Sequence, residues 1–320
     1  MSLFNSSKNA TALPTPDLRV HLGSLTLKNP VLVAAGTFGY GLEFARAVPL
    51  GQLGALITKT LTRVPRAGNQ PPRLVETPAG MLNAVGLQNI GLEAFLREKL
   101  PRLARYDVPV IVSVLGESLE DLPLMIQALE REAGVAAIEL NLSCPNVQRA
   151  SALMVAQDPQ ATAAMVSAAR AHTHKPLIAK LSPDVTDLAP IARAAQEAGA
   201  NALSLVNTFT GMSLDPATRR SRLGALTGGL SGPAIRPLAV YRVWYTAQVV
   251  RLPIVGVGGI ARAEDALEFF LAGASAVAVG TATFADPLAA LRILRGLTRY
   301  VIRHRLPSLE TLRGAISPPA

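Results

Sequence analysis

The sequence predicts an α/β protein of the (β/α)8, or TIM-barrel, class, with insertions at the C-terminal face of the strands. Eight short apolar runs recur along the 320 residues, separated by amphipathic stretches rich in Ala and Leu. The runs are continuous and bounded by Gly or Pro, as expected of parallel strands buried on both faces. The length accommodates a barrel of about 250 residues with insertions. An open doubly wound sheet is the alternative, because strand order cannot be read from periodicity.

The elements follow one another as strand and helix. The predicted strands span 31–36, 55–60, 109–115, 137–143, 176–181, 202–208, 253–258 and 276–281. The predicted helices span 118–133, 158–173, 185–198, 233–249, 263–272 and 286–301. The first of these helices starts with Ser118 followed three residues later by Asp121, which is an N-terminal capping pattern.

Two connections are too long for simple turns. They span 61–88, which contains four prolines, and 209–232. Both follow strand C-termini, the face of a barrel that carries active sites, so we expect them to cap a site. The whole chain then divides into a flexible N-terminal arm (1–17), one barrel domain (18–305) and a C-terminal tail (306–320).

Composition excludes several classes of protein. An apolar content of 49% argues against disorder, and a single cysteine excludes a disulfide framework or a Cys-rich zinc or iron–sulfur site within this chain. No run of about 18 apolar residues and no signal peptide is present, so a cytoplasmic protein without membrane insertion and without a metal site is expected. The net charge of +9 is spread over scattered arginines, which favours a soluble Arg-rich surface over a nucleic-acid interface. Attraction of small anions is the alternative.

Four polar residues interrupt the apolar strand ends. Lys59 and Lys180 each close a strand, and a buried lysine there is costly unless it meets an anion or an acceptor. Asn141 and Asn207 lie at two further strand ends, where their amides can pair with a planar polar ligand. A structural ion pair, or lysines that extend to solvent, would be the non-functional interpretation.

Glycines cluster after the last two predicted strands, in 256–260 (GVGGI) and at Gly280 before Thr281. This corner of a barrel often binds phosphate through backbone amides, and glycine lets the backbone approach the anion. Ser231 and Gly232 could add donors. Tight turns without a ligand would also explain the glycines.

Cys144 lies just past the fourth predicted strand, in a loop bounded by Pro145. A thiolate at that face could act as a base or a nucleophile, although most lone cysteines only pack in a core. None of the four histidines follows a strand C-terminus. A Cys–His dyad is therefore not indicated.

Taken together, these residues resemble the dihydroorotate dehydrogenase family, from about Leu18 to Arg305. The segments that carry the resemblance are AAGTFGYG (34–41), ITKT (57–60), NAVGLQNIG (83–91), ELNLSCPN (139–146), LVNT (205–208), TGGLSGPAIRPLA (227–239), GVGGI (256–260) and VGTATF (279–284). The sequence is most similar to the soluble class 1, NAD-linked (1B) catalytic-subunit type, because it has Cys144 instead of a serine base, no N-terminal helical extension, and the sequences LQN, GLSGPA and GVGGI.

The resemblance implies a set of site residues. FMN would contact Ala35, Lys59, Thr60, Ser113, Asn141, Lys180, Val206, Gly232, Gly258, Gly259, Gly280 and Thr281. Dihydroorotate would meet Lys59, Asn83, Ala84, Val85, Gly86, Leu87, Asn141, Asn146, Asn207 and Thr208. Two departures are that Ser113 stands where many members have Asn, and that Val147 to Ser151 replace a common Gly-Gly pair.

The reaction implied is the oxidation of (S)-dihydroorotate to orotate in pyrimidine (UMP) biosynthesis. Cys144 would remove the C5 proton while hydride passes from C6 to flavin N5, and Lys180 would stabilise the reduced flavin. Electrons would reach NAD⁺ through a partner subunit that carries FAD and a 2Fe–2S cluster, in a heterotetramer built on a homodimer of this chain. The alternatives are a fumarate-linked homodimer, a reductase of other dihydropyrimidines, or a phosphate-binding barrel without redox function.

Overall fold

The computed structural model describes residues 16–143 and 155–317. Its centre is a closed barrel of eight parallel strands that pair in chain order, and the last strand pairs with the first. The strands are β3 (Val31–Val33), β4 (Ala55–Ile57), β7 (Val110–Val114), β8 (Ala137–Asn141), β9 (Leu177–Lys180), β10 (Ala202–Leu205), β15 (Ile254–Val257) and β16 (Ala276–Val279). All eight predicted strands are confirmed, and closure excludes the open doubly wound sheet.

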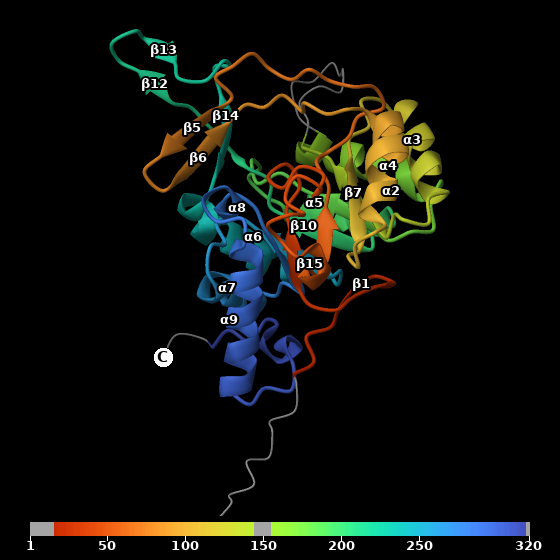
Figure 1. Ribbon diagram of the computed structural model, residues 1–320, viewed down its shortest axis with the longest axis vertical. Helices are drawn as coiled ribbons and strands as arrows, with labels where there is room; N and C mark the ends of the chain where they lie inside the picture. The colour runs from red at the N-terminus through yellow and green to blue at the C-terminus, as the bar shows by residue number, and fades with distance from the viewer. Residues whose placement is uncertain (1–15, 144–154, 318–320) are drawn as a thin grey trace, which may run out of the picture.

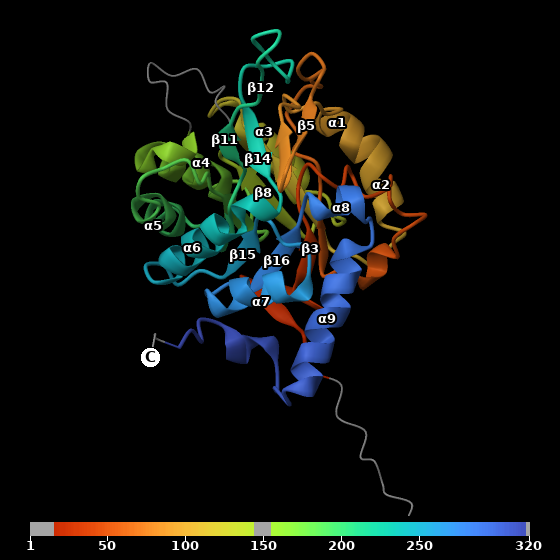
Figure 2. The same ribbon diagram turned by 90° about the vertical axis from the view of Figure 1, so that its left-hand side faces the viewer.

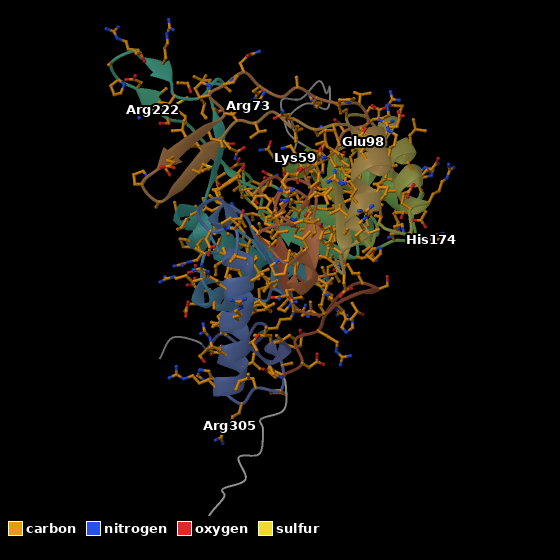
Figure 3. All side chains as sticks on the ribbon, in the orientation of Figure 1. Lys59, Arg73, Glu98, His174, Arg222 and Arg305 are labelled. Carbon is orange, nitrogen blue, oxygen red and sulfur yellow. The ribbon has the colours of Figure 1, made fainter. Side chains whose placement is uncertain are left out.

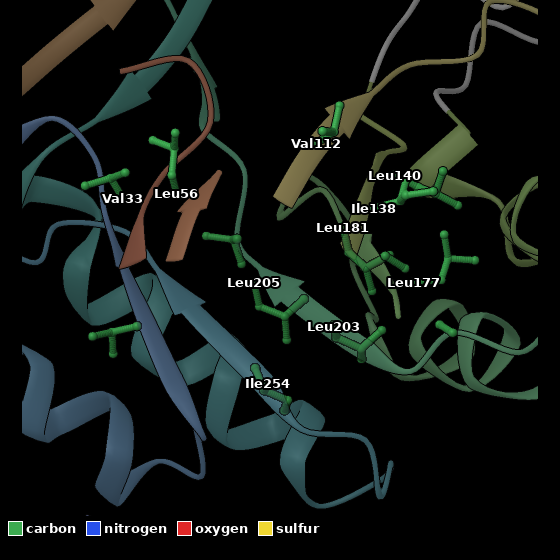
Figure 4. Close-up of a cluster of buried hydrophobic side chains, with 14 of the residues drawn as sticks. Val33, Leu56, Val112, Ile138, Leu140, Leu177, Leu181, Leu203, Leu205 and Ile254 are labelled. Carbon is green, nitrogen blue, oxygen red and sulfur yellow. The ribbon is translucent and has the colours of Figure 1, made fainter. Parts of the chain in front are cut away.

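Alternation of side chains along the strands divides the core into two clusters. Leu32, Ile57, Ile111, Ile178 and Val255 belong to the cluster that fills the barrel. Their sequence neighbours belong to a larger cluster between the strands and the helices, part of which is shown in Figure 4. Because both faces of each strand are covered, the strands read as continuous apolar runs.

The six predicted helices are present around the barrel (Figures 1 and 2). They are α3 (Asp121–Glu130), α4 (Pro159–Arg170), α5 (Ala189–Glu197), α6 (Arg236–Ala247), α7 (Ala263–Leu271) and α9 (Ala289–Arg303). Short 3₁₀ turns are η1 (Leu50–Gln52), η3 (Val155–Gln157) and η4 (Pro233–Ile235), and α8 (Ala282–Ala285) is a single turn.

Four helices begin three or four residues later than predicted, and at the start of three of them (α3, α5 and α9) a polar side chain accepts from a backbone N–H group. Ser118 Oγ accepts from the backbone N–H groups of Glu120 and Asp121, at 3.2 and 3.1 Å. Asp187 Oδ1 accepts from Ala189 N at 2.9 Å, and Asp286 Oδ1 accepts from Leu288 N at 3.0 Å. The helices α3, α5 and α9 therefore start after these residues.

One helical segment was not predicted. It consists of α1 (Leu92–Ala94), a π-helical turn η2 (Phe95–Lys99) and α2 (Leu100–Leu103). Pro101 lies inside it, and the irregular hydrogen bonding there removes the regular 3.6-residue period that identifies a helix in a sequence.

The two long connections form one antiparallel sheet over the barrel mouth, which we call the capping sheet. Its strands, in spatial order, are β11 (Phe209–Gly211), β14 (Gly228–Ser231), β6 (Gly80–Asn83) and β5 (Leu74–Thr77). A small hairpin of β12 (Leu214–Asp215) and β13 (Arg220–Ser221) extends beyond it. Figure 1 shows the capping sheet at the top of the molecule, at the C-terminal ends of the barrel strands, where insertions were predicted.

An antiparallel hairpin of β1 (Val20–Leu22) and β2 (Leu25–Leu27) contributes Leu22 and Leu27 to the cluster inside the barrel. After α9, the turn η5 (Leu309–Leu312) buries Leu309, and Gly314 N donates to Phe270 O at the end of α7. The segment predicted as a tail from residue 306 is thus packed against the barrel as far as Gly314. None of the helices in the described residues is long and apolar enough to cross a membrane.

Candidate active site

A cavity of about 1000 Å³ lies between the barrel mouth and the capping sheet. Nearly all of the predicted site residues line it. These are Ala35, Lys59, Thr60, Asn83, Ala84, Val85, Gly86, Leu87, Asn141, Lys180, Val206, Asn207, Thr208, Gly232, Gly258, Gly259, Gly280 and Thr281. The fold thus brings together residues from seven barrel strands or their ends and from both insertions.

A row of side-chain hydrogen bonds crosses the barrel mouth. Asn207 Nδ2 donates to Asn141 Oδ1 at 3.4 Å, and Asn141 Nδ2 donates to Thr60 Oγ1 at 3.4 Å. Thr60 Oγ1 in turn lies 3.0 Å from Ser113 Oγ. The row fixes which way each amide points, so a planar ligand above it would meet a defined order of donors and acceptors.

Ser113 is the described residue predicted to bind the cofactor that does not line the cavity. Its side chain is completely buried, and its hydroxyl contacts Thr60. Serine is shorter than the asparagine that many family members have at this position, and its side chain extends no further than this contact. Ser113 therefore reaches the cavity only through Thr60.

Two lysines bring positive charge to the cavity. Lys180 is 7% exposed, Lys59 follows β4, and both side chains line the cavity. Burial, together with the positive charge of Arg73, lowers the pKa of Lys59 below its ordinary value. Figure 3 labels Lys59 and Arg73 at the same end of the molecule as the capping sheet. An anionic group in the cavity would offset this unfavourable charge arrangement.

The predicted phosphate site, which we call the glycine corner, is formed by three segments that all line the cavity. They are residues 231–232, 258–259 and 280–281. Gly259 has φ +71°, and a Cβ there would lie 2.8 Å from Gly232 O and 2.9 Å from Arg236 N, so no larger residue fits. Thr281 Oγ1 donates to Ser231 Oγ at 2.8 Å. Backbone that only glycine can form and two hydroxyls at one end of the cavity fit a phosphate group.

The segment 83–87 is held in place by residues that the sequence analysis did not identify. Asn69 Nδ2 donates to Ala84 O at 3.0 Å, and Asn69 N donates to Val85 O at 3.1 Å. The Arg73 guanidinium donates to the backbone of Ala67 and Asn69 and to Gln88 Oε1, at 2.9, 2.5 and 2.7 Å. These residues lie in a proline-rich stretch without periodicity, so only their nearness to the NAVGL motif could have drawn attention to them.

Two predicted residues, Cys144 and Asn146, lie outside the described residues. Ser143, which precedes Cys144, lines the cavity. The capping sheet adds Glu76 and Met81 to the lining, two residues that no sequence motif indicated. Among the described residues, no group of three or more His, Cys, Asp or Glu side chains is placed to hold a metal ion.

Comparison with known proteins identifies the family. The family model described as dihydroorotate dehydrogenase matches residues 17–301. This chain belongs to the dihydroorotate dehydrogenase family. The resemblance carried by the eight sequence segments is thereby confirmed.

Individual relatives cover nearly the whole chain. The protein named "dihydroorotate dehydrogenase B (NAD(+)), catalytic subunit" of Citrifermentans bemidjiense is 50% identical over 301 residues, which is 94% of this chain and 98% of the relative. Its namesake in Desulforudis audaxviator is 53% identical over 296 residues, covering 92% and 96%. The one in Thermodesulfovibrio yellowstonii is 47% identical over 300 residues, covering 94% and 99%. Within the dihydroorotate dehydrogenase family, this chain is therefore similar to NAD-linked catalytic subunits.

Proposed function

We propose that this protein oxidises (S)-dihydroorotate to orotate with FMN as its cofactor, and that it is the catalytic subunit of an NAD-linked enzyme of pyrimidine biosynthesis. The observation that carries the proposal is that one cavity joins the glycine corner to the two lysines and the row of asparagines. The glycine corner suits a phosphate. The lysines and amides suit a planar anionic ring, and about 1000 Å³ accommodates both.

The chain's own residues bind and orient the reactants. FMN, when bound, supplies the electron acceptor for the C–H bond that is broken. Asn141 and Asn207 hold the planar substrate by paired donors and acceptors, which reduces the entropy lost on reaching the reactive arrangement. Lys59 binds the anionic substrate, and Lys180 balances the negative charge that develops beside it.

The proton at C5 of the substrate requires a base, and we assign this role to Cys144. A positioned base contributes about 10²–10⁴-fold to such a step. Replacing Cys144 with Ala should slow reduction of the bound flavin by dihydroorotate, measured anaerobically by stopped flow, by about that factor. The binding of orotate should remain. Reduction at the wild-type rate would refute the assignment.

The electrons then leave this chain. We propose that they reach NAD⁺ through a partner subunit with FAD and a 2Fe–2S cluster, with two copies of each subunit forming a heterotetramer in the cytoplasm. The relatives named catalytic subunits support this proposal. Copurification of a second subunit and NAD⁺ reduction by the complex, but not by the isolated chain, are the expected results.

An absorption spectrum tests the whole proposal. The purified protein should be yellow, and anaerobic dihydroorotate should bleach it. A colourless protein that takes up no FMN would favour a phosphate-binding barrel without redox function. Bleaching by dihydrouracil but not by dihydroorotate would favour a reductase of other dihydropyrimidines. Rapid turnover with fumarate by the isolated chain would favour the fumarate-linked enzyme.

A further inference from the structure

Glu139 is a carboxyl group inside the barrel that the proposed chemistry does not use. It lies on β8, its side chain is completely buried, and neither of its carboxyl oxygens has a hydrogen-bond partner. Buried polar groups almost always have partners, and an isolated buried charge is very costly. A buried carboxyl group on this strand therefore requires a physical reason.

The register of the barrel identifies the side chains around it. Ala137 belongs to the cluster inside the barrel and Asn141 lines the cavity, so Glu139, midway between them, points inward as well. Asn141 pairs in register with Lys180 on β9. Glu139 therefore lies one pleat below the strand position beside Lys180, a diagonal Cα separation of about 8 Å that long side chains can bridge.

A third polar residue belongs to this group. Ser204 on β10 pairs in register with Lys180, is completely buried, and has a hydroxyl without a partner. Lys180 is thus flanked in register by Asn141 and Ser204, with Glu139 below. The inward positions further down these three strands are Ala137, Ile178 and Ala202, which are apolar. The inward polar positions of these three strands are therefore concentrated near the level of Lys180 in the barrel.

We propose that Glu139 is the counter-charge of Lys180 and a positioning residue for it. The two groups form no direct hydrogen bond in this structure, so the carboxylate acts on the ammonium through its charge across the barrel interior. Once the cofactor is bound, it limits how much positive charge Lys180 presents. The effect on the cofactor rests on the proposed function. The interaction between Glu139 and Lys180 does not depend on the proposed function.

A double-mutant cycle in the FMN-free protein tests the pairing. Lys180→Met should lower Tm by about 5 °C, because it leaves a buried carboxylate without a counter-charge, and adding Glu139→Gln should restore most of that loss. Lys59→Met with and without Glu139→Gln is the matched control, in which the two effects should add. Additive effects of Glu139→Gln and Lys180→Met would overturn the proposal. So would a failure of the double variant to fold better than Lys180→Met.

The flavin gives a second readout that is independent of turnover. In FMN-loaded protein, Glu139→Gln should favour reduced over oxidised FMN about tenfold more than the wild type, which corresponds to about 30 mV for a two-electron couple. Glu139→Asp should keep the wild-type potential, and in a Lys180→Met background the shift should vanish. An unchanged potential in Glu139→Gln would overturn the proposal. If the protein takes up no FMN, the proposed function fails, and the unfolding cycle still decides the pairing.

Discussion

Lys59 combines burial, a neighbouring cation and a place in the cavity wall. Burial and the charge of Arg73 lower the pKa of its ammonium group, and no acidic residue of the described chain opposes them. The charged form of Lys59 is therefore less stable in the folded protein than in the unfolded chain. Lys59 therefore lowers the stability of the ligand-free folded protein at a position that suits the binding of an anion.

Lys59→Met should stabilise the ligand-free protein and weaken the binding of orotate. Between the lowered pKa and the ordinary lysine value of about 10.4, the unfolded chain binds more protons than the folded one. Wild-type stability should therefore rise with pH through that window, and the Met variant should lack the rise. Thermal unfolding at several pH values measures this. Lys28→Met, at an exposed ion pair with Asp107, is the control and should change Tm little.

Ser113→Ala tests whether this residue acts on the cofactor through Thr60. The substitution removes the hydroxyl–hydroxyl contact of 3.0 Å and should cost about 1 kcal/mol of stability. We expect Ser113→Ala and Thr60→Val to weaken FMN binding in a non-additive way, measured by fluorescence titration. Independent, additive effects would mean that Ser113 does not act through Thr60.

At the scale of elements, the sequence predicted what depends on local pattern. The eight barrel strands and six helices each carry their own apolar period or cap. The strands of the capping sheet carry no such local pattern. Strands β6 and β14 pair across nearly 150 residues, and the burial of their side chains alternates only weakly. The strand ends also carried Lys59, Lys180, Asn141 and Asn207, so most of the site could be predicted. Asn69, Arg73 and Glu139 could not, since their roles depend on tertiary neighbours.

The segment 83–87 depends on a close approach at Gly86. This residue has φ +71°, and a Cβ there would lie 2.6 Å from Asn69 N. Gly86→Ala should displace the segment and weaken orotate binding at least tenfold, as calorimetry can measure. Gly314→Ala is a matched control, because Gly314 has a similar φ of +69° but no atom within 4 Å of the added Cβ. The control should lose some stability through backbone strain and retain wild-type orotate affinity.

The whole molecule combines a rigid barrel with a thin cover. The barrel strands are buried on both faces, whereas only Leu82 of the capping sheet is fully buried in a small cluster of its own, with Ala84 and Leu223 from the adjoining loops. Local opening should therefore begin in the cover. Backbone amides of β5, β6, β11 and β14 should exchange with deuterium faster than those of the barrel strands. Bound FMN and orotate should slow them selectively, and uniform exchange across both sheets would contradict this.

The pairing of β16 with β3 also sets an order of events during synthesis of the chain. The barrel cannot close before β16 has been made, and Gly280 and Thr281 of the glycine corner follow that strand directly. Contacts so distant in sequence form late, because the entropy of closing a long loop must first be offset. A nascent chain that ends before β16 therefore lacks part of the glycine corner. A phosphate-bearing cofactor that needs this corner can therefore be bound only after β16 has been synthesised.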